Sequence, residues 1–202
     1  MYVIHVYGTS HVSEDSFEVI DRALEEHDPE IVAVELDTAR LNSMLTGQED
    51  GTPNMFLWVL KKMQDFAGSK TGVIPGQEMK YAFNKSMAQG REVALIDQDI
   101  RVTMNRLKQV SRKEKIRALL SLAGGFFMSD DIDISKIPEQ ELIGEMIEQF
   151  GEEFPGLYRV LIDERNRVMV ARLRRLDEDT EGDIVAFVGA GHEAAMKKEL
   201  QS

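Results

Sequence analysis

Four short runs of apolar, largely β-branched residues are spread along this chain, and they limit the folds open to it. They cover residues 2–7, 31–36, 93–97 and 184–188. Runs of this length that are apolar almost throughout are typical of strands buried on both faces of a parallel sheet. Sequence with helical periodicity separates them, as the crossovers between parallel strands require. The sequence therefore predicts an α/β fold with a central, mainly parallel sheet flanked by helices.

The stretch from about residue 101 to residue 176 is different, because it is rich in helical patterns and contains no convincing strand. It lies between the third and the last predicted strand, so we expect a helical insertion packed on the α/β core rather than a separate tail. The chain of 202 residues is long enough to bury a sizeable core. We expect a single domain over residues 1–202.

Composition narrows the classes of partner. The formal net charge of −12 argues against nucleic acid as the main partner. The sequence has no cysteine, so a metal would have to be held by histidine and carboxylate groups. No apolar run approaches the roughly 20 residues of a membrane span, and no signal peptide is visible, so we expect a soluble, cytoplasmic chain. The basic run over residues 101–117 is most simply a solvated helix face, with contact to an anionic membrane as the alternative.

Two copies of a Gly-x-x-His pattern follow the first and the last predicted strand. They are Gly8-Thr9-Ser10-His11 and Gly189-Ala190-Gly191-His192. A glycine at this place permits a tight turn with a positive φ. The histidine is then expected in or just before the first turn of the next helix, where the helix dipole disfavours imidazolium and leaves the ring able to bind a metal. The matching positions predict that His11 and His192 share one functional site.

Carboxylates lie at the ends of the second and third predicted strands. Glu35 lies at the end of the second predicted strand and Asp37 directly follows it, whereas Asp97 ends the third and Asp99 follows it. Ligands of open α/β sheets gather at the carboxyl ends of the strands. Imidazoles and carboxylates at one such edge are the groups expected of a divalent-metal site or of a general acid–base site. The two other histidines, His5 and His27, are interpreted as an edge or core residue and a surface residue, with no role assigned.

Three further polar residues are candidates for the same site. Arg165 interrupts an apolar stripe on a helix expected over residues 157–176, and Asn166 borders that stripe. Arg165 is interpreted either as a structural salt bridge to an acidic strand end or as a group that orients a catalytic carboxylate or binds a substrate oxyanion. Glu78 lies in the first turn of another expected helix, where the helix dipole alone would favour a carboxylate, so its place in the site stays open.

In these residues and their order along the sequence, the chain resembles the TraB/PrgY/GumN family, which is related to the Tiki metalloproteases. The segments that carry the resemblance span nearly the whole chain: Gly8–Ser13, Val32–Asp37 with Arg40, Gly76–Met79, Asp97–Ile100 with Arg106, Asp163–Asn166 and Gly189–His192. The resemblance implies an EreA/ChaN-like α/β fold and divalent-metal peptidase activity, with manganese or cobalt as first candidates and zinc as a third. It also implies functional roles for His11, His192 and Glu35, and then for Glu78, Arg165 and Asn166.

Many microbial relatives of this kind continue into a hydrophobic membrane region that this chain lacks, so the resemblance allows membrane association through a segment of a longer protein. Some members are linked to the inhibition of peptide pheromones.

The leading functional hypothesis is a metal-dependent peptidase in which His11, Glu35 and His192 hold the cation. Glu78 or Glu35 would then take the proton of the attacking water, and Arg165 would stabilise the oxyanion. The alternatives are a protein that binds or sequesters peptides without turnover, and a metal-independent esterase-like hydrolase. An apolar, methionine-rich segment containing Met44, Met55 and Met63 is interpreted mainly as core, with a lid or a homodimer surface as alternatives.

Overall fold

A four-stranded parallel sheet forms the centre of the protein, in a computed structural model that describes residues 3–9, 15–46, 76–124 and 139–202. The strand order is β1-β4-β2-β3, so the first and last strands of the chain are neighbours and β1 lies at an edge. In register, Ile4 pairs with Ile184, and Ile184 also pairs with Ile31. The bounds are β1 Ile4–Thr9, β2 Ile31–Val34, β3 Glu92–Leu95 and β4 Ile184–Gly189. The predicted α/β fold with a parallel sheet is confirmed.

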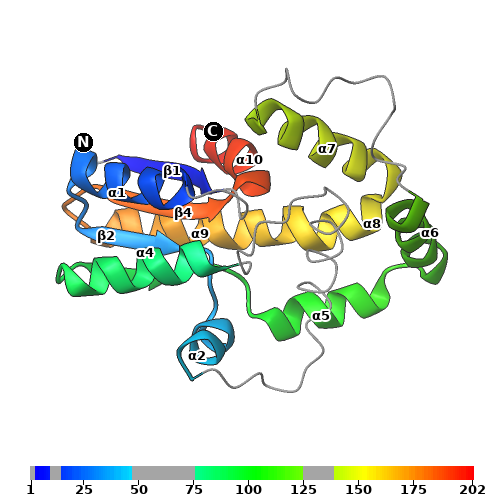
Figure 1. Ribbon diagram of the computed structural model, residues 1–202, viewed down its shortest axis with the longest axis horizontal. Helices are drawn as coiled ribbons and strands as arrows, with labels where there is room; N and C mark the ends of the chain where they lie inside the picture. Colours follow the sequence, from blue (N-terminus) through cyan, green and yellow to red (C-terminus); the bar gives the residue numbers. More distant parts are fainter. Residues whose placement is uncertain (1–2, 10–14, 47–75, 125–138) are drawn as a thin grey trace.

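Helices cover both faces of this sheet (Figure 1). The two middle strands are buried throughout, as their continuous apolar sequence predicts. One face packs against α1 (Asp15–His27), α2 (Thr38–Thr46) and α4 (Gln77–Ala88), with Ile20, Leu24 and Met79 in that core. The other face packs against α9 (Glu164–Asp179) and α10 (Ala190–Leu200), with Met169, Leu173 and Met196. The result is a three-layer arrangement with a buried sheet.

The remaining helices lie beyond the end of the sheet toward which the strands point (Figure 1). They are α5 (Ile100–Gln109), α6 (Arg112–Gly124), α7 (Glu139–Glu153) and α8 (Pro155–Tyr158). They bury a smaller apolar cluster of their own, which includes Leu107, Phe154 and Val160. The described part of residues 101–176 contains helices and no strand, as predicted. The cations of the basic run are mostly exposed, in agreement with a solvated helix face: Arg101, Arg106, Lys108, Arg112, Lys113 and Arg117.

One π-helical turn separates α8 from α9. It covers Arg159–Asp163, and the N–H of Glu164 bonds to the carbonyl of Arg159. The sequence predicts one helix over residues 157–176, and the chain is helical from Pro155 to Asp179 with this turn inside it. A π-turn adds a residue to one helical turn and so changes which side chains face the neighbouring layer. Arg165 and Asn166 follow directly and are both buried.

The methionine-rich segment is described only at Met44, which packs against the core on the α4 side of the sheet. Met55 and Met63 lie outside the described residues. The lid and homodimer interpretations therefore stay predictions.

Candidate functional site

The carboxyl ends of β2 and β4 are tied together through Glu35. Its backbone N–H donates to the carbonyl of Phe187 at 3.0 Å, which extends the pairing of the two strands by one residue. Its side chain accepts a hydrogen bond from the N–H of Gly189 at 2.6 Å through Oε2. Glu35 is 9% exposed. The strand ends therefore hold this carboxylate at the edge of the sheet with one oxygen already fixed.

Arg165 crosses from α9 to these strand ends and uses all five of its N–H donors. Nε and Nη2 donate to the two oxygens of Asp97 at 3.0 and 2.7 Å, and Nη2 also donates to Oε1 of Glu35. Nη1 donates to the carbonyl of Leu161 at 3.2 Å and lies 3.1 Å from Nε2 of His192. The side chain is 3% exposed. Both interpretations left open by the sequence agree with this geometry, because Arg165 pairs with an acidic strand end and orients Glu35.

His192 is the third residue of α10, within the first helical turn as predicted. Its Nδ1 lies 2.6 Å from Oδ1 of Asn166, and its Nε2 faces the Nη1 of Arg165. A guanidinium nitrogen can only donate, so Nε2 must accept, and the ring hydrogen is then on Nδ1 and donated to Asn166. Nε2 also lies 3.5 Å from Oε1 of Glu35. The imidazole is thus held neutral in one tautomer, next to a carboxylate.

A second arginine completes this network. Arg40 donates from Nε to Oδ2 of Asp37 at 2.6 Å and from Nη2 to Oδ2 of Asp97. Oδ1 of Asp37 accepts from the N–H of Ala39 at 2.8 Å, so Asp37 also caps the start of α2. The sequence identified Asp37 and Asp97 as strand-end carboxylates but did not include them or Arg40 in the site. The available signal was an arginine three residues after a strand-end aspartate.

The charges of this network hold the Glu35 carboxyl in its ionised form. Burial acts to raise the pKa of Glu35, but His192 when protonated, Arg165 and the Gly189 N–H together lower it well below its usual value. Burial and the neighbouring charge of Arg165 both lower the pKa of Arg40. Glu35 is therefore a carboxylate at neutral pH, and its lowered pKa makes it a weak proton acceptor.

The structure corrects the expectation of positive φ at the glycines of the twin motifs, and at Gly8 the lack of a side chain serves close packing instead. Gly189 has φ −61° and ψ 142°, and among described glycines only Gly76 and Gly90 have positive φ. A Cβ on Gly8 would lie 2.4 Å from Oε2 of Glu193, and one on Gly191 would lie 3.1 Å from Cδ1 of Ile147. The backbone needs no unusual dihedrals there, because each strand continues directly into the turn. At Gly8 the absence of a side chain leaves room for Glu193 of α10, and at Gly191 it leaves room for Ile147 of α7.

Two predicted site residues, Glu78 and His11, are not part of the network around Arg165 as the structure describes it. Glu78 is 2% exposed and lies on the buried stripe of α4 with Ala82 and Ser86. Because α4 leads back to the amino end of β3, its own amino end lies at the carboxyl edge of the sheet, on the same side as Glu35. His11 lies outside the described residues. The structure therefore brings together Glu35, Arg165, Asn166 and His192 and leaves the place of His11 a prediction.

The donor atoms of Glu35 and His192, as they lie, do not fit a divalent cation. The oxygens of Glu35 face Arg165 and Gly189, and the nitrogens of His192 face Asn166 and Arg165. A permanent cation, the guanidinium of Arg165, thus occupies the space between the carboxylate and the imidazole that a metal would need. A metal bound by these two groups would have to displace Arg165. The predicted ligand set of His11, Glu35 and His192 stays a prediction, and no chemical step below depends on it.

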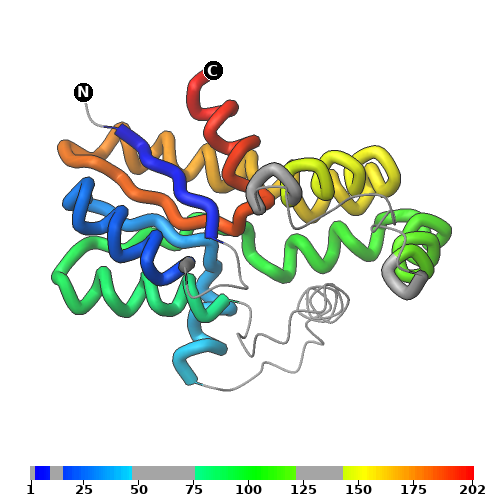
Figure 2. Tube along the Cα trace, turned by 45° about the horizontal axis from the view of Figure 1, so that its top comes forward, coloured from blue at the N-terminus to red at the C-terminus, as the bar shows by residue number. Residues whose placement is uncertain are grey.

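A cavity of about 420 Å³ lies beside this network, between α7 and the first turns of α10. Figure 2 shows the two helices next to each other. The lining includes Ile143, Ile147 and Tyr158 on one side and Gly191 and Glu193, which flank His192, on the other. The volume falls in the range of small-molecule pockets, about 300–1,000 Å³. The side chain of His192 itself is turned away from this cavity, toward α9.

Comparison with known proteins identifies the family of this chain. The sequence model of the TraB/PrgY/gumN family matches residues 2–200. The chain belongs to the TraB/PrgY/gumN family. It is 33% identical over 217 aligned positions to an uncharacterized protein of Methanocaldococcus jannaschii, with 98% of this chain and 53% of that protein covered. TraB domain-containing proteins of Homo sapiens and Bos taurus are 26% and 25% identical, with 96% of this chain and 62% of each relative covered.

This TraB-family chain thus spans about half to two thirds of the length of the relatives it matches. In the part of it that the structure describes, no helix is both long and apolar enough to cross a membrane. Family membership agrees with the resemblance seen in the sequence, and the match includes the ends of β2, β3 and β4 that supply the network around Arg165.

Proposed function

We propose that this TraB-family chain is a hydrolase of peptide bonds, with His192 as the proton-transferring group. The observation that carries the proposal is the setting of this imidazole. Asn166 holds it in a single tautomer through a 2.6 Å contact, and the ionised Glu35 lies 3.5 Å from the nitrogen that bears the lone pair. A neutral imidazole that is oriented by one partner and lies beside a carboxylate is suited to general-base catalysis.

The first proposed step moves a proton from a water molecule to Nε2 of His192 while the water oxygen attacks the peptide carbonyl. Nε2 accepts from Arg165 at rest, so the Nη1 N–H of Arg165 must turn away from the ring. The four other N–H donors keep Arg165 bound to Asp97, Glu35 and Leu161. The released N–H can then donate to the oxyanion that develops on the carbonyl oxygen, where such a donor is most effective.

The second proposed step returns the proton from Nε2 to the departing amine as the carbon–nitrogen bond breaks. Between the two steps the imidazolium is stabilised by the negative charge of Glu35. Asn166 accepts from Nδ1 throughout, which keeps the reactive nitrogen on the Glu35 side. In this proposal the cavity next to Gly191 and Glu193 takes an apolar side chain of the peptide, and the bond to be cleaved lies outside it, on the α9 side toward which His192 is turned.

A divalent cation, with manganese or cobalt first and zinc third, remains part of the proposal only as a predicted ligand of His11 together with Glu35 and His192. Histidine and carboxylate donors are the right chemistry for such a cation, and it would polarise the carbonyl. Binding at Glu35 and His192 needs Arg165 to be displaced, as described above.

A second candidate is a protein that binds peptides without cleaving them. The completeness of the hydrogen bonding favours it, because every donor of Arg165 and both nitrogens of His192 already have partners within the chain. Such a network stabilises a fold whether or not it reacts. The cavity between α7 and α10 would then be the peptide-binding site.

Cleavage of a peptide library, followed by mass spectrometry, tests the proposal. We expect new termini with the wild-type chain and with His5→Gln, a histidine at the other end of the strands, and none with His192→Gln. Equal cleavage by His192→Gln would refute the role of this imidazole. Retention of uncleaved peptides by the wild-type chain would instead support the binding protein.

A further inference from the structure

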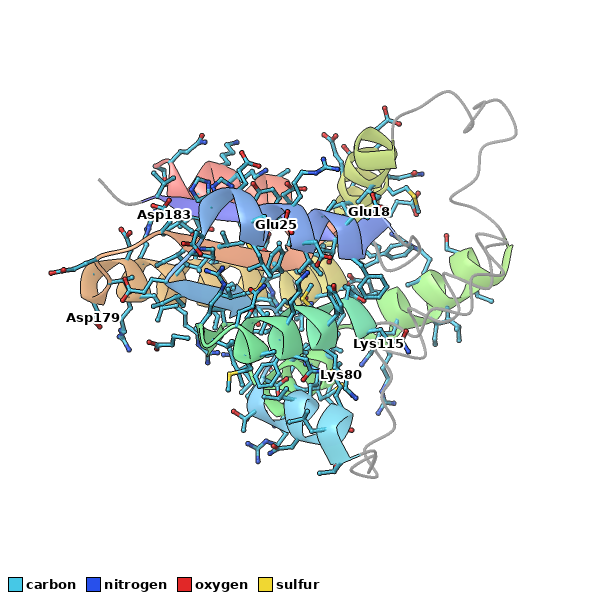
Figure 3. All side chains as sticks on the ribbon, turned by 60° about the vertical axis from the view of Figure 1, so that its left-hand side comes forward. Glu18, Glu25, Lys80, Lys115, Asp179 and Asp183 are labelled. Carbon is cyan, nitrogen blue, oxygen red and sulfur yellow. The ribbon has the colours of Figure 1, made fainter. Side chains whose placement is uncertain are left out.

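A second group of polar side chains lies at the amino-terminal ends of the strands, away from the network around Arg165. His5 is the second residue of β1, His27 is the last residue of α1, and Asp183 directly precedes β4. Figure 3 labels Asp183 at the side of the sheet away from Lys115 of α6. Because all strands are parallel, this edge is opposite to the one that carries Glu35 and His192.

The three side chains are close enough to share one ion. One potential ligand atom from each lies within 4.8 Å of the other two. Nε2 of His5 is 3.7 Å from Oδ2 of Asp183, longer than a normal hydrogen bond. In a tetrahedral site with bonds of about 2.0–2.2 Å, ligand atoms are separated by roughly 3.3 Å. The ligand atoms would therefore have to approach one another by at most about 1.5 Å.

The surroundings of the three groups also resemble those of a metal site. Oδ1 of Asp183 accepts from the N–H of Val3 at 3.0 Å, which fixes the carboxylate and leaves Oδ2 directed to His5. The hydroxyl of Tyr7 lies 2.6 Å from Nε2 of His27, so it can orient this ring and leave Nδ1 as the nitrogen for an ion. Outer contacts of this kind are common around metal ligands. All three residues are partly exposed, which gives an ion a way in.

The two imidazoles stack at 3.7 Å between centroids with an angle of 19° between their planes. Burial and then the nearby charge of His27 lower the pKa of His5, and Asp183 opposes them. Metals bind imidazole nitrogens in the ring plane, and two nearly parallel planes cannot both point at one ion. Binding would therefore turn one ring out of the stack about χ2. The ring signals of both histidines would report this change.

We propose that His5, His27 and Asp183 bind one divalent first-row transition-metal ion, such as Zn²⁺, at the amino-terminal edge of the sheet. Two imidazoles and a carboxylate are ligands that such ions favour, and water would complete the coordination. The ion would join β1, the end of α1 and the start of β4. This site is independent of the proposed hydrolase chemistry, since it shares no residue with it.

The test is Zn²⁺ binding to the full chain after chelator treatment, measured by calorimetry and by protein-to-metal stoichiometry. We expect the double variant His5→Gln/His27→Gln to bind one Zn²⁺ fewer than the wild-type chain, and Asp183→Asn to bind it at least tenfold more weakly. Asp179→Asn, an exposed acidic residue nearby, and His192→Gln should keep this ion. An equal stoichiometry for the double variant and the wild-type chain would refute the site.

A second measurement does not depend on the folding of any variant. Zn²⁺ added to the wild-type chain should shift the imidazole NMR signals of His5 and His27, because it breaks their stack. Saturating Zn²⁺ should also raise Tm by about 5 °C or more, as expected when a ligand binds only the folded state. Unchanged ring signals for both histidines at saturating Zn²⁺ would equally refute the site, whatever the outcome for peptide cleavage.

Discussion

Replacement of Arg165 by methionine tests whether the network at the carboxyl edge of the sheet is held by this one guanidinium. The substitution keeps much of the side-chain volume but removes the donors to Asp97, Glu35, Leu161 and His192. Each hydrogen bond to a charged group is worth about 1.5–3 kcal/mol. Arg40 stays beside Asp97 and offsets part of the loss. We therefore expect the cost of breaking a buried ion pair, about 3–5 kcal/mol in the free energy of unfolding.

The assay is urea denaturation at pH 7, followed by circular dichroism, with Arg174→Met as the matched control. Arg174 is on the same helix but is exposed, and its contact is with the carbonyl of Glu199. We expect the control to lose less than about 1 kcal/mol. A similar, small loss for both variants would refute the reasoning, because it would mean that the buried carboxylates do not depend on Arg165.

The same variant should respond to pH in a defined direction. With Arg165 removed, the effect of burial on Glu35 is opposed by fewer charges, so the pKa of Glu35 rises. As the pH falls through this raised pKa, Glu35 becomes neutral and its buried charge no longer destabilises the variant. The difference in unfolding free energy between wild type and Arg165→Met should therefore be smaller at pH 5 than at pH 7. A constant difference would argue against a buried, ionised Glu35.

Three further predictions concern Glu35, Gly8 and metal. Glu35→Gln should destabilise the protein at pH 7, and because the folded-state pKa of Glu35 is lowered from 4.5, the difference should shrink as the pH falls below about 4.5, as measured by urea denaturation across pH. Gly8→Ala should lower the free energy of unfolding by about 1–3 kcal/mol, because the new Cβ would meet Oε2 of Glu193. The double variant Gly8→Ala/Glu193→Ala should recover only part of this loss, because the new Cβ would still lie 3.1 Å from the Cα of Ala190. Peptide cleavage should survive exhaustive chelation if His192 acts without metal, whereas loss of cleavage that Mn²⁺ restores would favour the predicted cation at His11, Glu35 and His192.

Much of the fold follows from the sequence because it depends on local patterns. The continuous apolar runs predict strands buried on both faces, and β2 and β4 are such strands. Their ends predict where Glu35 and His192 meet, since parallel strands bring their carboxyl ends to one edge. The helical periodicity around Arg165 predicts a charged residue on a buried face, which α9 carries.

The parts that the sequence did not predict depend on contacts between distant residues. The sequence around Gly8 does not indicate that Glu193 packs over it. The glycine was therefore interpreted as a requirement for a positive φ and not for close packing. The π-turn before Arg165 has no clear sequence signature, and it changes which side of the helix the following residues occupy. His27 was expected at the surface, but it stacks on His5 because α1 ends beside β1, a fact of topology rather than of pattern.

The protonation of the central network follows from one constraint. Three carboxylates, those of Glu35, Asp37 and Asp97, face the two guanidiniums of Arg40 and Arg165, so the described charges sum to one negative charge while His192 is neutral. A proton on Nε2 of His192 would bring this sum to zero, yet it would also point an N–H at the Nη1 of Arg165. The imidazole can therefore become charged only as Arg165 withdraws one N–H from it. Protonation of His192 and the release of one N–H donor of Arg165 therefore occur together. The proposed reaction needs both: the protonated imidazole to supply the proton of the departing amine, and the released N–H to stabilise the oxyanion.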